Sequence, residues 1–212
     1  HSFLVLDVKK IRLILELRES GISDSKILSA IEKIPREKFI PENFRNQAYD
    51  NLALPIGENQ TISQPFVVAK MTQLLEVKSS HKILEIGTGS GYQSAVLSKL
   101  VRRVYTIERI KNLLIKAEKI FQELNISNIV PKYADGNLGW KEQIPFDRII
   151  ITAATPSISK EIALQIIEGG IIVSPMVQEN KQIIVRYTKI DNVLKSEIFD
   201  DVLFVPNLSG TQ

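Results

Sequence analysis

Three alternating glycines stand where an apolar segment gives way to a helical pattern. The run Gly87-Thr88-Gly89-Ser90-Gly91 follows Ile83-Leu84-Glu85-Ile86 and precedes residues with helical spacing. Glycines at such a strand-to-helix junction let the backbone approach a ligand closely. The first N–H groups of the following helix suit an anionic group such as a phosphate or a carboxylate. The run therefore predicts a site for a small polar ligand.

Acidic residues after two further apolar runs narrow the identity of this ligand. Dinucleotide-binding loops use the spacing G-x-G-x-x-G, whereas the spacing here is G-x-G-x-G. Val104-Tyr105-Thr106-Ile107 is predicted as the next strand and ends at Glu108, whose carboxylate can accept both hydroxyls of a ribose. Asp135-Gly136 follows a third apolar run and could reach an adenine amino group. The alternatives are a solvated charge at Glu108 and a turn-forming pair at Asp135-Gly136.

The composition argues against several kinds of chemistry. The 212 residues contain no cysteine, which excludes disulfides and thiolate nucleophiles, and only His1 and His81 could supply imidazole. We therefore expect neither a metal site nor a Ser-His relay. The 27 Lys and Arg residues are dispersed among 24 Asp and Glu residues, which does not indicate a nucleic-acid partner. No segment reaches the roughly 18 apolar residues of a membrane span.

The elements that must position these residues follow from hydrophobic patterning. From Lys82 onward apolar strands alternate with helical patterns, which favours a parallel sheet covered on both faces. The expected strands are 82–86, 103–107, 129–133, 147–152 and 170–175. The helices expected between them are 91–100, 111–124 and 157–168. Residues 182–189 and 194–205 resemble an antiparallel pair around a turn at Asp191-Asn192. The chain is thus expected to be α/β, with a doubly wound, mostly parallel sheet and an antiparallel C-terminal edge.

Helices are expected ahead of this sheet. One follows the spacing of Leu4, Val8, Ile11 and Leu15 and stops at Gly21, and its charged residues favour an amphipathic helix over a signal peptide. A second should start at Ser23 as its N-cap and end before Pro35, and a third can begin at Pro65. Between them, residues 36–62 are predicted to be a long irregular stretch and the candidate lid.

The motifs found so far resemble those of a known enzyme family. The glycine run with Glu108 and Asp135-Gly136 resembles the S-adenosylmethionine site of Rossmann-like methyltransferases. Leu54-Pro55-Ile56-Gly57-Glu58-Asn59-Gln60-Thr61-Ile62-Ser63-Gln64-Pro65 is similar, more narrowly, to the signature of protein-L-isoaspartate O-methyltransferases. Residues 147–154 and the run Phe204-Val205-Pro206-Asn207-Leu208 also resemble segments of that family, so the likeness covers nearly the whole chain. The family usually has Gly where Asn59 stands, and because Asn tolerates positive φ, we expect the turn to survive.

The resemblance implies a role for each site residue. Ser63 matches the family's active-site serine, so we expect it to be catalytic, although its position before Pro65 would also suit a helix N-cap. Substrate contacts are expected at Gln60, Thr61 and Ile62. The implied cofactor-binding residues are Gly87, Thr88, Gly89, Ser90, Glu108, Asp135 and Gly136.

The resemblance also implies a reaction. A methyl group would pass from S-adenosylmethionine to the free carboxylate of L-isoaspartyl residues in damaged peptides and proteins, which initiates repair through a succinimide. A carboxylate with a pKa of about 4 is ionised at neutral pH and needs no general base, in agreement with the absence of Cys and the scarcity of His. We expect a hydroxyl, that of Ser63, to orient this carboxylate.

The sequence also leads to expectations about domain organisation, localisation and partners. One methyltransferase domain over 1–212 would comprise a helical extension with the substrate loop, 1–78, and a cofactor-binding core with a C-terminal hairpin, 79–212. A cytoplasmic monomer is expected, with isoaspartyl peptides and proteins as partners and neither nucleic acid nor membrane. The alternatives are an S-adenosylmethionine-dependent enzyme with another acceptor and a non-catalytic cofactor-binding protein of the same fold. Nicotinamide-dependent hydride transfer is disfavoured by the glycine spacing.

Overall fold

A seven-stranded sheet forms the centre of the molecule. The computed structural model describes residues 2–199. The strands lie in the order β5-β4-β3-β6-β7-β8-β9, and the first five in this order are parallel while β8 and β9 run antiparallel to their neighbours. Their bounds are β3 Lys82–Ile86, β4 Arg103–Glu108, β5 Ile129–Tyr133, β6 Phe146–Ile151, β7 Ile166–Gln178, β8 Lys181–Ile190 and β9 Val193–Phe199. The predicted fold class is confirmed.

Apolar side chains on both faces explain why these segments pair as a buried sheet. Successive residues of a strand point to opposite faces, so a continuous apolar run supplies two cores. Ile83 and Ile150 pack on one face, and their neighbours Leu84 and Ile149 pack on the other. All four are fully buried.

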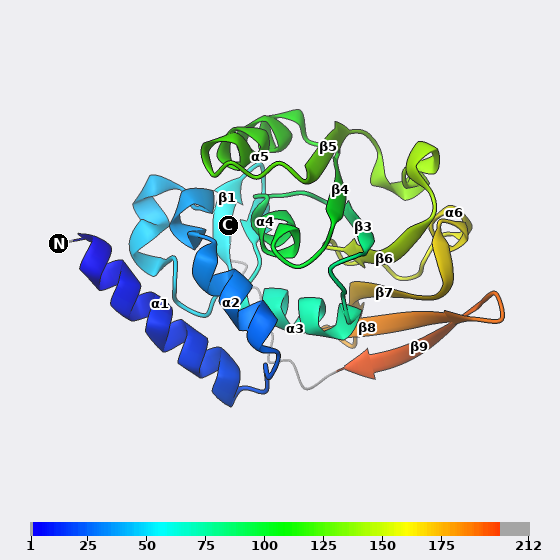
Figure 1. Ribbon diagram of the computed structural model, residues 1–212, viewed down its shortest axis with the longest axis horizontal. Coiled ribbons are helices and arrows are strands. Elements are labelled where there is room, and N and C mark those ends of the chain that lie inside the picture. The colour runs from blue at the N-terminus through cyan, green and yellow to red at the C-terminus, as the bar shows by residue number, and fades with distance from the viewer. Residues whose placement is uncertain (1, 200–212) are drawn as a thin grey trace.

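Helices cover both faces of this sheet (Figure 1). Side chains of α3 and the end of α4 share a core with one face, whereas α6 packs on the other. A further core joins α4 and α5 to the N-terminal helices α1 and α2. The bounds are α1 Ser2–Glu19, α2 Ser25–Lys33, α3 Pro65–Leu75, α4 Tyr92–Ser98, α5 Lys111–Glu123 and α6 Lys160–Leu164. Within residues 2–199, no helix is both long enough and apolar enough to cross a membrane.

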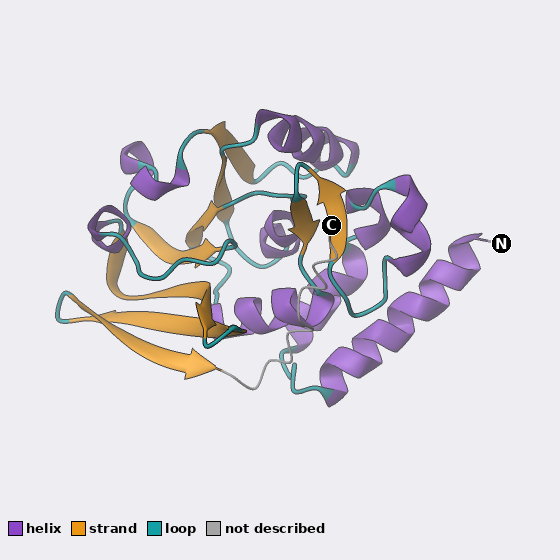
Figure 2. Cartoon of the chain, turned by 180° about the vertical axis from the view of Figure 1, so that it is seen from behind, coloured by secondary structure: helices purple, strands orange, loops and turns teal. Residues whose placement is uncertain are grey.

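The segment 36–62 is more regular than its sequence predicts. It contains the 3-10 helices Arg36–Phe39 and Glu42–Gln47 and then a hairpin of β1, Leu54–Gly57, and β2, Gln60–Ile62. Figure 2 shows this hairpin apart from the main sheet. Its turn residues Glu58 and Asn59 have φ of 54° and 56°, so Asn59 adopts the left-handed conformation expected of it. A lid function for the segment stays a prediction.

Several predicted boundaries are wrong. Asp24, not Ser23, caps α2, because its carboxylate accepts the Lys26 N–H at 2.9 Å. The helix expected over 157–168 ends at Leu164, since Ile166 already pairs with Phe146 and starts β7. The turn at Asp191-Asn192 is confirmed by positive φ at both residues. The end of the expected strand 194–205 and the run 204–208 lie outside the described residues.

The strand order creates a crevice at the carboxyl end of β3. The chain passes from β3 to β4 on one side and returns to β6 on the other side of β3. Ligands of doubly wound sheets bind where the order reverses in this way, beyond the carboxyl ends of the strands. The glycine run 87–91 begins directly after β3 and therefore lies at this point.

Candidate active site

A cavity of about 460 Å³ lies beyond the carboxyl ends of β3 and β4. Its volume is within the usual range for small-molecule sites. Elements far apart in the sequence meet here, because the hairpin strand β2 faces the loop after β3. Every residue predicted for the site lines this one cavity, namely Gln60, Thr61, Ile62, Ser63, Gly87, Thr88, Gly89, Ser90, Glu108, Asp135 and Gly136.

The glycine loop is held by backbone contacts that a side chain would prevent. Gly87 has a φ of +101°, and a Cβ atom there would lie 2.2 Å from Thr152 Oγ1. The Thr152 hydroxyl instead donates to the Gly87 carbonyl at 2.6 Å. On the other side, the Gly87 and Thr88 N–H groups donate to the Ile107 carbonyl at 2.8 and 3.1 Å. The loop is thus fixed between β6 and β4 with its backbone against the cavity.

Glu108 joins the glycine loop to the end of β4. Its Oε1 accepts the Gly89 N–H at 2.8 Å and its Oε2 accepts the Ile110 N–H at 2.8 Å. The side chain is only 6% exposed, so the alternative of a solvated charge is wrong. Each carboxylate oxygen can accept a second hydrogen bond. The group can therefore organise the loop and still receive two ligand hydroxyls.

Two other predicted residues also have local structural contacts. Ser90 Oγ accepts the Tyr92 N–H at 3.1 Å at the start of α4. Asp135 Oδ1 accepts the Asn137 N–H at 2.9 Å, so the turn-forming alternative for Asp135-Gly136 holds beside its place in the cavity wall. The first contact orders the start of α4, and the second orders the turn after β5. Both segments form part of the cavity wall.

Ser63 lies in the cavity wall and does not cap the helix that follows it. The N-cap position of α3 is Gln64, with Pro65 at the first helical position. The Ser63 carbonyl accepts a hydrogen bond from Arg36 Nη2 at 2.9 Å. Ser63 is half-buried and borders the cavity. The alternative of a purely capping serine therefore does not apply.

A buried carboxyl group lies beneath the glycine loop. Glu85 of β3 is 0% exposed, and its Oε1 accepts hydrogen bonds from the Ser94 hydroxyl and from Thr106 Oγ1, the latter at 2.6 Å. Thr106 Oγ1 is in turn 2.6 Å from Thr88 Oγ1 in the loop. Burial raises the pKa of Glu85 from its usual 4.5 to about 7, although the two hydroxyl hydrogen bonds oppose this.

This raised pKa predicts a pH dependence of stability. Between pH 4.5 and about 7 the folded state holds a proton on Glu85 that the unfolded state has lost, so the free energy of unfolding falls as pH rises through that window. The loss should total about 3 kcal/mol. Urea unfolding of the wild type and Glu85→Gln at pH 5, 6, 7 and 8 measures it. An equal slope in both proteins would contradict the assignment to Glu85.

Some cavity residues were not among those predicted. The segment 152–155 lines the cavity after β6, together with Val68 of α3 and with Tyr92 and Gln93 of α4. The Gln93 side-chain amide donates to Thr72 Oγ1 at 2.9 Å and so ties α4 to α3. The segment 152–155 could have been identified from its position directly after strand β6, because the carboxyl ends of parallel strands lie at the same edge of the sheet. Val68, Tyr92 and Gln93 carry no such signal.

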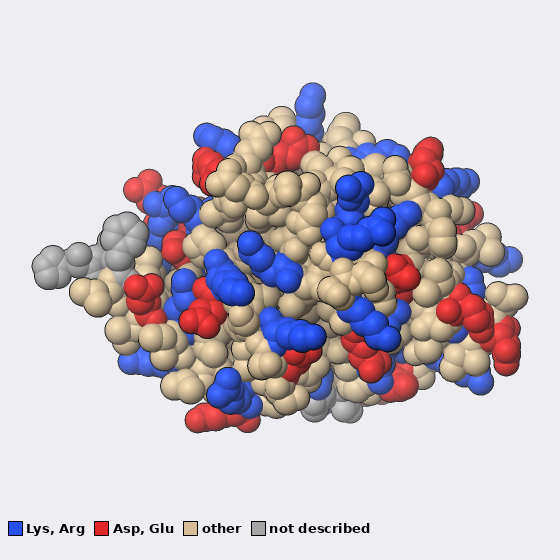
Figure 3. All heavy atoms as spheres, in the orientation of Figure 1, with Lys and Arg blue, Asp and Glu red and all other residues tan. Residues whose placement is uncertain are grey.

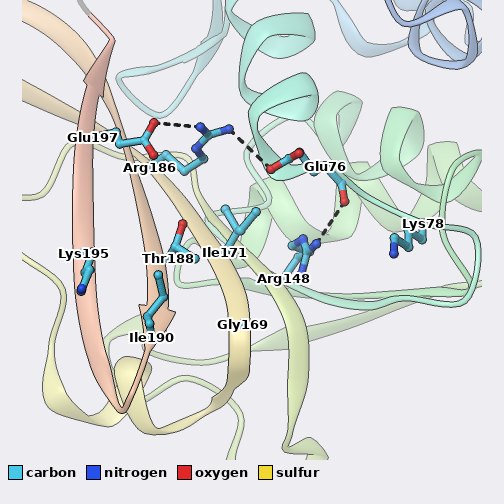
Figure 4. A pocket seen from close by; sticks show the side chains of 10 residues that line it. All are labelled: Glu76, Lys78, Arg148, Gly169, Ile171, Arg186, Thr188, Ile190, Lys195 and Glu197. Carbon is cyan, nitrogen blue, oxygen red and sulfur yellow. Dashed lines mark hydrogen bonds and ion pairs between the residues drawn. The ribbon is translucent and has the colours of Figure 1, made fainter.

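A second hollow, of about 590 Å³, lies at the opposite end of β6 (Figure 4). Two of its cationic side chains, those of Arg148 and Arg186, contact the end of α3. Arg148 donates to the Leu75 and Glu76 carbonyls, and Arg186 contacts Glu76 and Glu197 carboxylates at 3.6 and 2.8 Å. Cations at a helix C-terminus satisfy its free carbonyls and stabilise its dipole. This hollow contains none of the predicted site residues, and its contacts serve the fold.

Acidic and imidazole side chains do not gather into a metal centre in residues 2–199. No group of three or more His, Asp or Glu side chains there could hold an ion. His81 Nδ1 accepts the Lys78 N–H at 3.0 Å in the loop before β3. The cavity itself is lined by the Ser63 hydroxyl, by carboxylates such as that of Glu108 and by the backbone of the glycine loop.

The sheet order, the glycine loop and Glu108 at the next strand end define an S-adenosylmethionine-dependent methyltransferase of Rossmann-like fold. The family model of protein-L-isoaspartate(D-aspartate) O-methyltransferase matches residues 8–212. The chain belongs to this family, and it catalyses methyl transfer from S-adenosylmethionine to isoaspartyl carboxylates.

Individual relatives agree with this assignment. The chain is 48% identical over 205 residues to protein-L-isoaspartate O-methyltransferase of Maricaulis maris, covering 96% of both chains. It is 52% identical over 202 residues to that of Paramagnetospirillum magneticum, covering 94% of both. These alignments span the hairpin and the core together.

Solved structures show the same fold. A protein-L-isoaspartate O-methyltransferase superposes with a TM-score of 0.81 at 27% identity, covering 92% of this chain and 65% of that one. A Plasmodium falciparum protein described as a putative protein-L-isoaspartate O-methyltransferase, in complex with S-adenosyl-L-homocysteine, gives a TM-score of 0.77 at 22% identity. The latter covers 92% of this chain and 95% of that chain.

Proposed function

We propose that methyl transfer takes place in the cavity beyond β3 and β4, with the cofactor against the glycine loop and the isoaspartyl carboxylate at Ser63. The observation that carries this proposal is that Ser63 and the run 87–90 line one cavity although they come from separate parts of the chain. A donor and an acceptor bound in one cavity can be held in line for displacement, which is catalysis by proximity and orientation.

The residues of the cavity fit S-adenosylmethionine. Gly87, Thr88, Gly89 and Ser90 would hold its methionine end, where a Cβ built at Gly89 would have no atom within 4 Å, so the backbone there is open. Glu108 would accept the ribose hydroxyls with its remaining lone pairs, and Asp135 with Gly136 would lie beside the adenine. When bound, the cofactor supplies an electrophilic methyl group on a sulfonium.

The substrate side of the cavity needs no base. The Ser63 hydroxyl would donate one hydrogen bond to the carboxylate and leave its nucleophilic oxygen free. Gln60 and Thr61 are exposed on β2, where they would contact the peptide. Ile62 is 2% exposed and would support β2 from its buried side. Because strand β2 pairs with β1, these contacts are presented from an ordered hairpin.

We further propose one domain over 1–212, in which 1–78 provides the substrate loop and 79–212 the cofactor core and C-terminal hairpin. It would act as a cytoplasmic monomer on isoaspartyl peptides and proteins, without nucleic acid or membrane. In support of a monomer, all predicted site residues line one cavity within a single chain, so the site needs no residue from a second copy. On the face in Figure 3, basic side chains are interspersed with acidic ones.

Hydrogen exchange tests where the two ligands bind. S-adenosylhomocysteine alone is expected to slow amide exchange in 87–91 and 108–110, and an isoaspartyl peptide added with it should slow exchange in 60–63. The matched aspartyl peptide is the control and should leave 60–63 unchanged. Protection by the peptide at the second hollow instead, around Arg148 and Lys195, would contradict the proposal.

A further inference from the structure

Arg36 is a fully buried arginine directly behind the Ser63 wall of the cavity. It is 0% exposed and begins the 3-10 helix Arg36–Phe39. Its Nε donates to the Ala48 carbonyl at 2.8 Å, and its Nη2 donates to the Ser63 carbonyl at 2.9 Å and reaches that of Leu52 at 3.5 Å. One guanidinium thus contacts backbone carbonyls at three separate positions of the segment that ends at Ser63.

The charge of Arg36 has no anionic partner within residues 2–199. No carboxylate there forms an ion pair with it, and Nη1 lacks a hydrogen-bond partner. Burying an unpaired cation is costly, and an apolar side chain of similar volume often stabilises such a position better. Packing alone therefore does not account for an arginine here, whereas a planar fork of donors aimed at carbonyls does.

The guanidinium also packs against a residue that lines the cavity on the side of the glycine loop. Its Cζ lies 4.8 Å from the ring centroid of Tyr92, the first residue of α4. Tyr92 is itself 1% exposed, lines the cavity and packs edge-on against Phe39 at 5.6 Å. Arg36 accordingly stands between the turn that presents Ser63 and the helix that follows the glycine loop.

We propose that Arg36 is a positioning residue for methyl transfer, acting through the Ser63 carbonyl to fix the Ser63 hydroxyl relative to the cofactor loop. Holding the carbonyl fixes the Ser63–Gln64 peptide plane and so restricts the positions open to the Ser63 Cα–Cβ bond. A misplacement of about 1 Å can cost roughly 100-fold in rate. The inference rests on the role proposed for Ser63 and adds the residue that holds the Ser63 backbone in place.

The chain offers a matched control in Arg148. This arginine is 8% exposed and also donates to backbone carbonyls, those of Leu75, Glu76 and Asp147, but it lies in the second hollow. Arg36→Met and Arg148→Met therefore remove the same kind of buried contact at the cavity and away from it. Both substitutions leave backbone carbonyls without their donor, so both are expected to lower the melting temperature even though a buried charge is removed.

Kinetics and binding separate positioning from folding. Arg36→Met is expected to lower kcat at least about tenfold while the Kd of S-adenosylhomocysteine, measured by calorimetry, changes less than about threefold. Arg36→Lys, which keeps the charge but not the fork, should lose less activity and keeps the test available if the methionine variant unfolds. Arg148→Met should keep kcat. Amide exchange in 60–66 should quicken only in the Arg36 variants.

A double-mutant cycle gives the decisive outcome. In a Ser63→Ala background, Arg36→Met should reduce kcat by less than about twofold, because the group it positions is already gone. If Arg36→Met lowered kcat by the same factor in the wild type and in the Ser63→Ala background, the inference would be overturned while the role of Ser63 stayed intact. Equal kcat in the Arg36 and Arg148 variants would have the same consequence. An unchanged kcat in Ser63→Ala alone would overturn the proposed function and the inference with it.

Discussion

Replacing Ser63 by alanine is expected to lower kcat for an isoaspartyl peptide by roughly 10- to 100-fold while cofactor affinity stays within a few-fold. The hydroxyl is the group at the substrate side of the cavity that can donate to the carboxylate without neutralising it. Because the carboxylate is already ionised, what is lost is alignment and not proton transfer. Single-turnover rates at saturating cofactor, with calorimetric Kd values for S-adenosylhomocysteine, measure the two quantities separately.

Two companion variants sharpen this prediction. Ser80→Ala removes a hydroxyl from an exposed loop and should leave both quantities unchanged. Ser63→Thr keeps a hydroxyl and should retain more turnover than Ser63→Ala. A loss confined to cofactor binding in Ser63→Ala would contradict the role given to this serine.

Glu108→Ala is expected to weaken S-adenosylhomocysteine binding by roughly 100-fold, which corresponds to about 3 kcal/mol. The carboxylate accepts the Gly89 and Ile110 N–H groups, so its loss releases the glycine loop as well as the ribose contact. Hydrogen bonds to a charged group are worth about 1.5 to 3 kcal/mol each. Calorimetric titration of the variant gives the Kd directly.

The matched control for this variant is Glu123→Ala, an exposed glutamate near the end of α5. It removes the same charge from the surface and should leave the Kd unchanged. Glu108→Gln keeps an acceptor oxygen and should lie between the wild type and Glu108→Ala. Wild-type affinity in Glu108→Ala would show that this carboxylate neither orders the loop nor meets the cofactor.

The cofactor side of the site could be predicted from sequence because its signals are local. Glycines at a strand end, and acids at the ends of the following strands, are placed together by the rule that parallel strands share one carboxyl edge. Asn59 likewise adopts the positive φ that its residue type allows. Such features depend on a few neighbouring residues and on one general topology.

The remaining features depend on partners distant in sequence. Glu58 has positive φ although glutamate rarely adopts it, and the pairing of β1 with β2, which brings Gly57 opposite Gln60, imposes the turn. The helix before β7 is cut short by the pairing of Ile166 with Phe146. The burial of Arg36 could not be predicted from sequence, because arginine is mostly exposed in proteins and the partners of Arg36 lie up to 27 residues away in the chain.

The most direct test of isoaspartyl methylation uses methyl-labelled S-adenosylmethionine and two peptides that differ only in isoaspartyl or normal aspartyl linkage. The enzyme should transfer base-labile label to the isoaspartyl peptide alone, and the ester should collapse to a succinimide that reopens in part as normal aspartate. Cofactor binding is confirmed by calorimetry in the same preparation. Equal labelling of both peptides, or no labelling with cofactor bound, would contradict isoaspartyl methylation as the function of this chain.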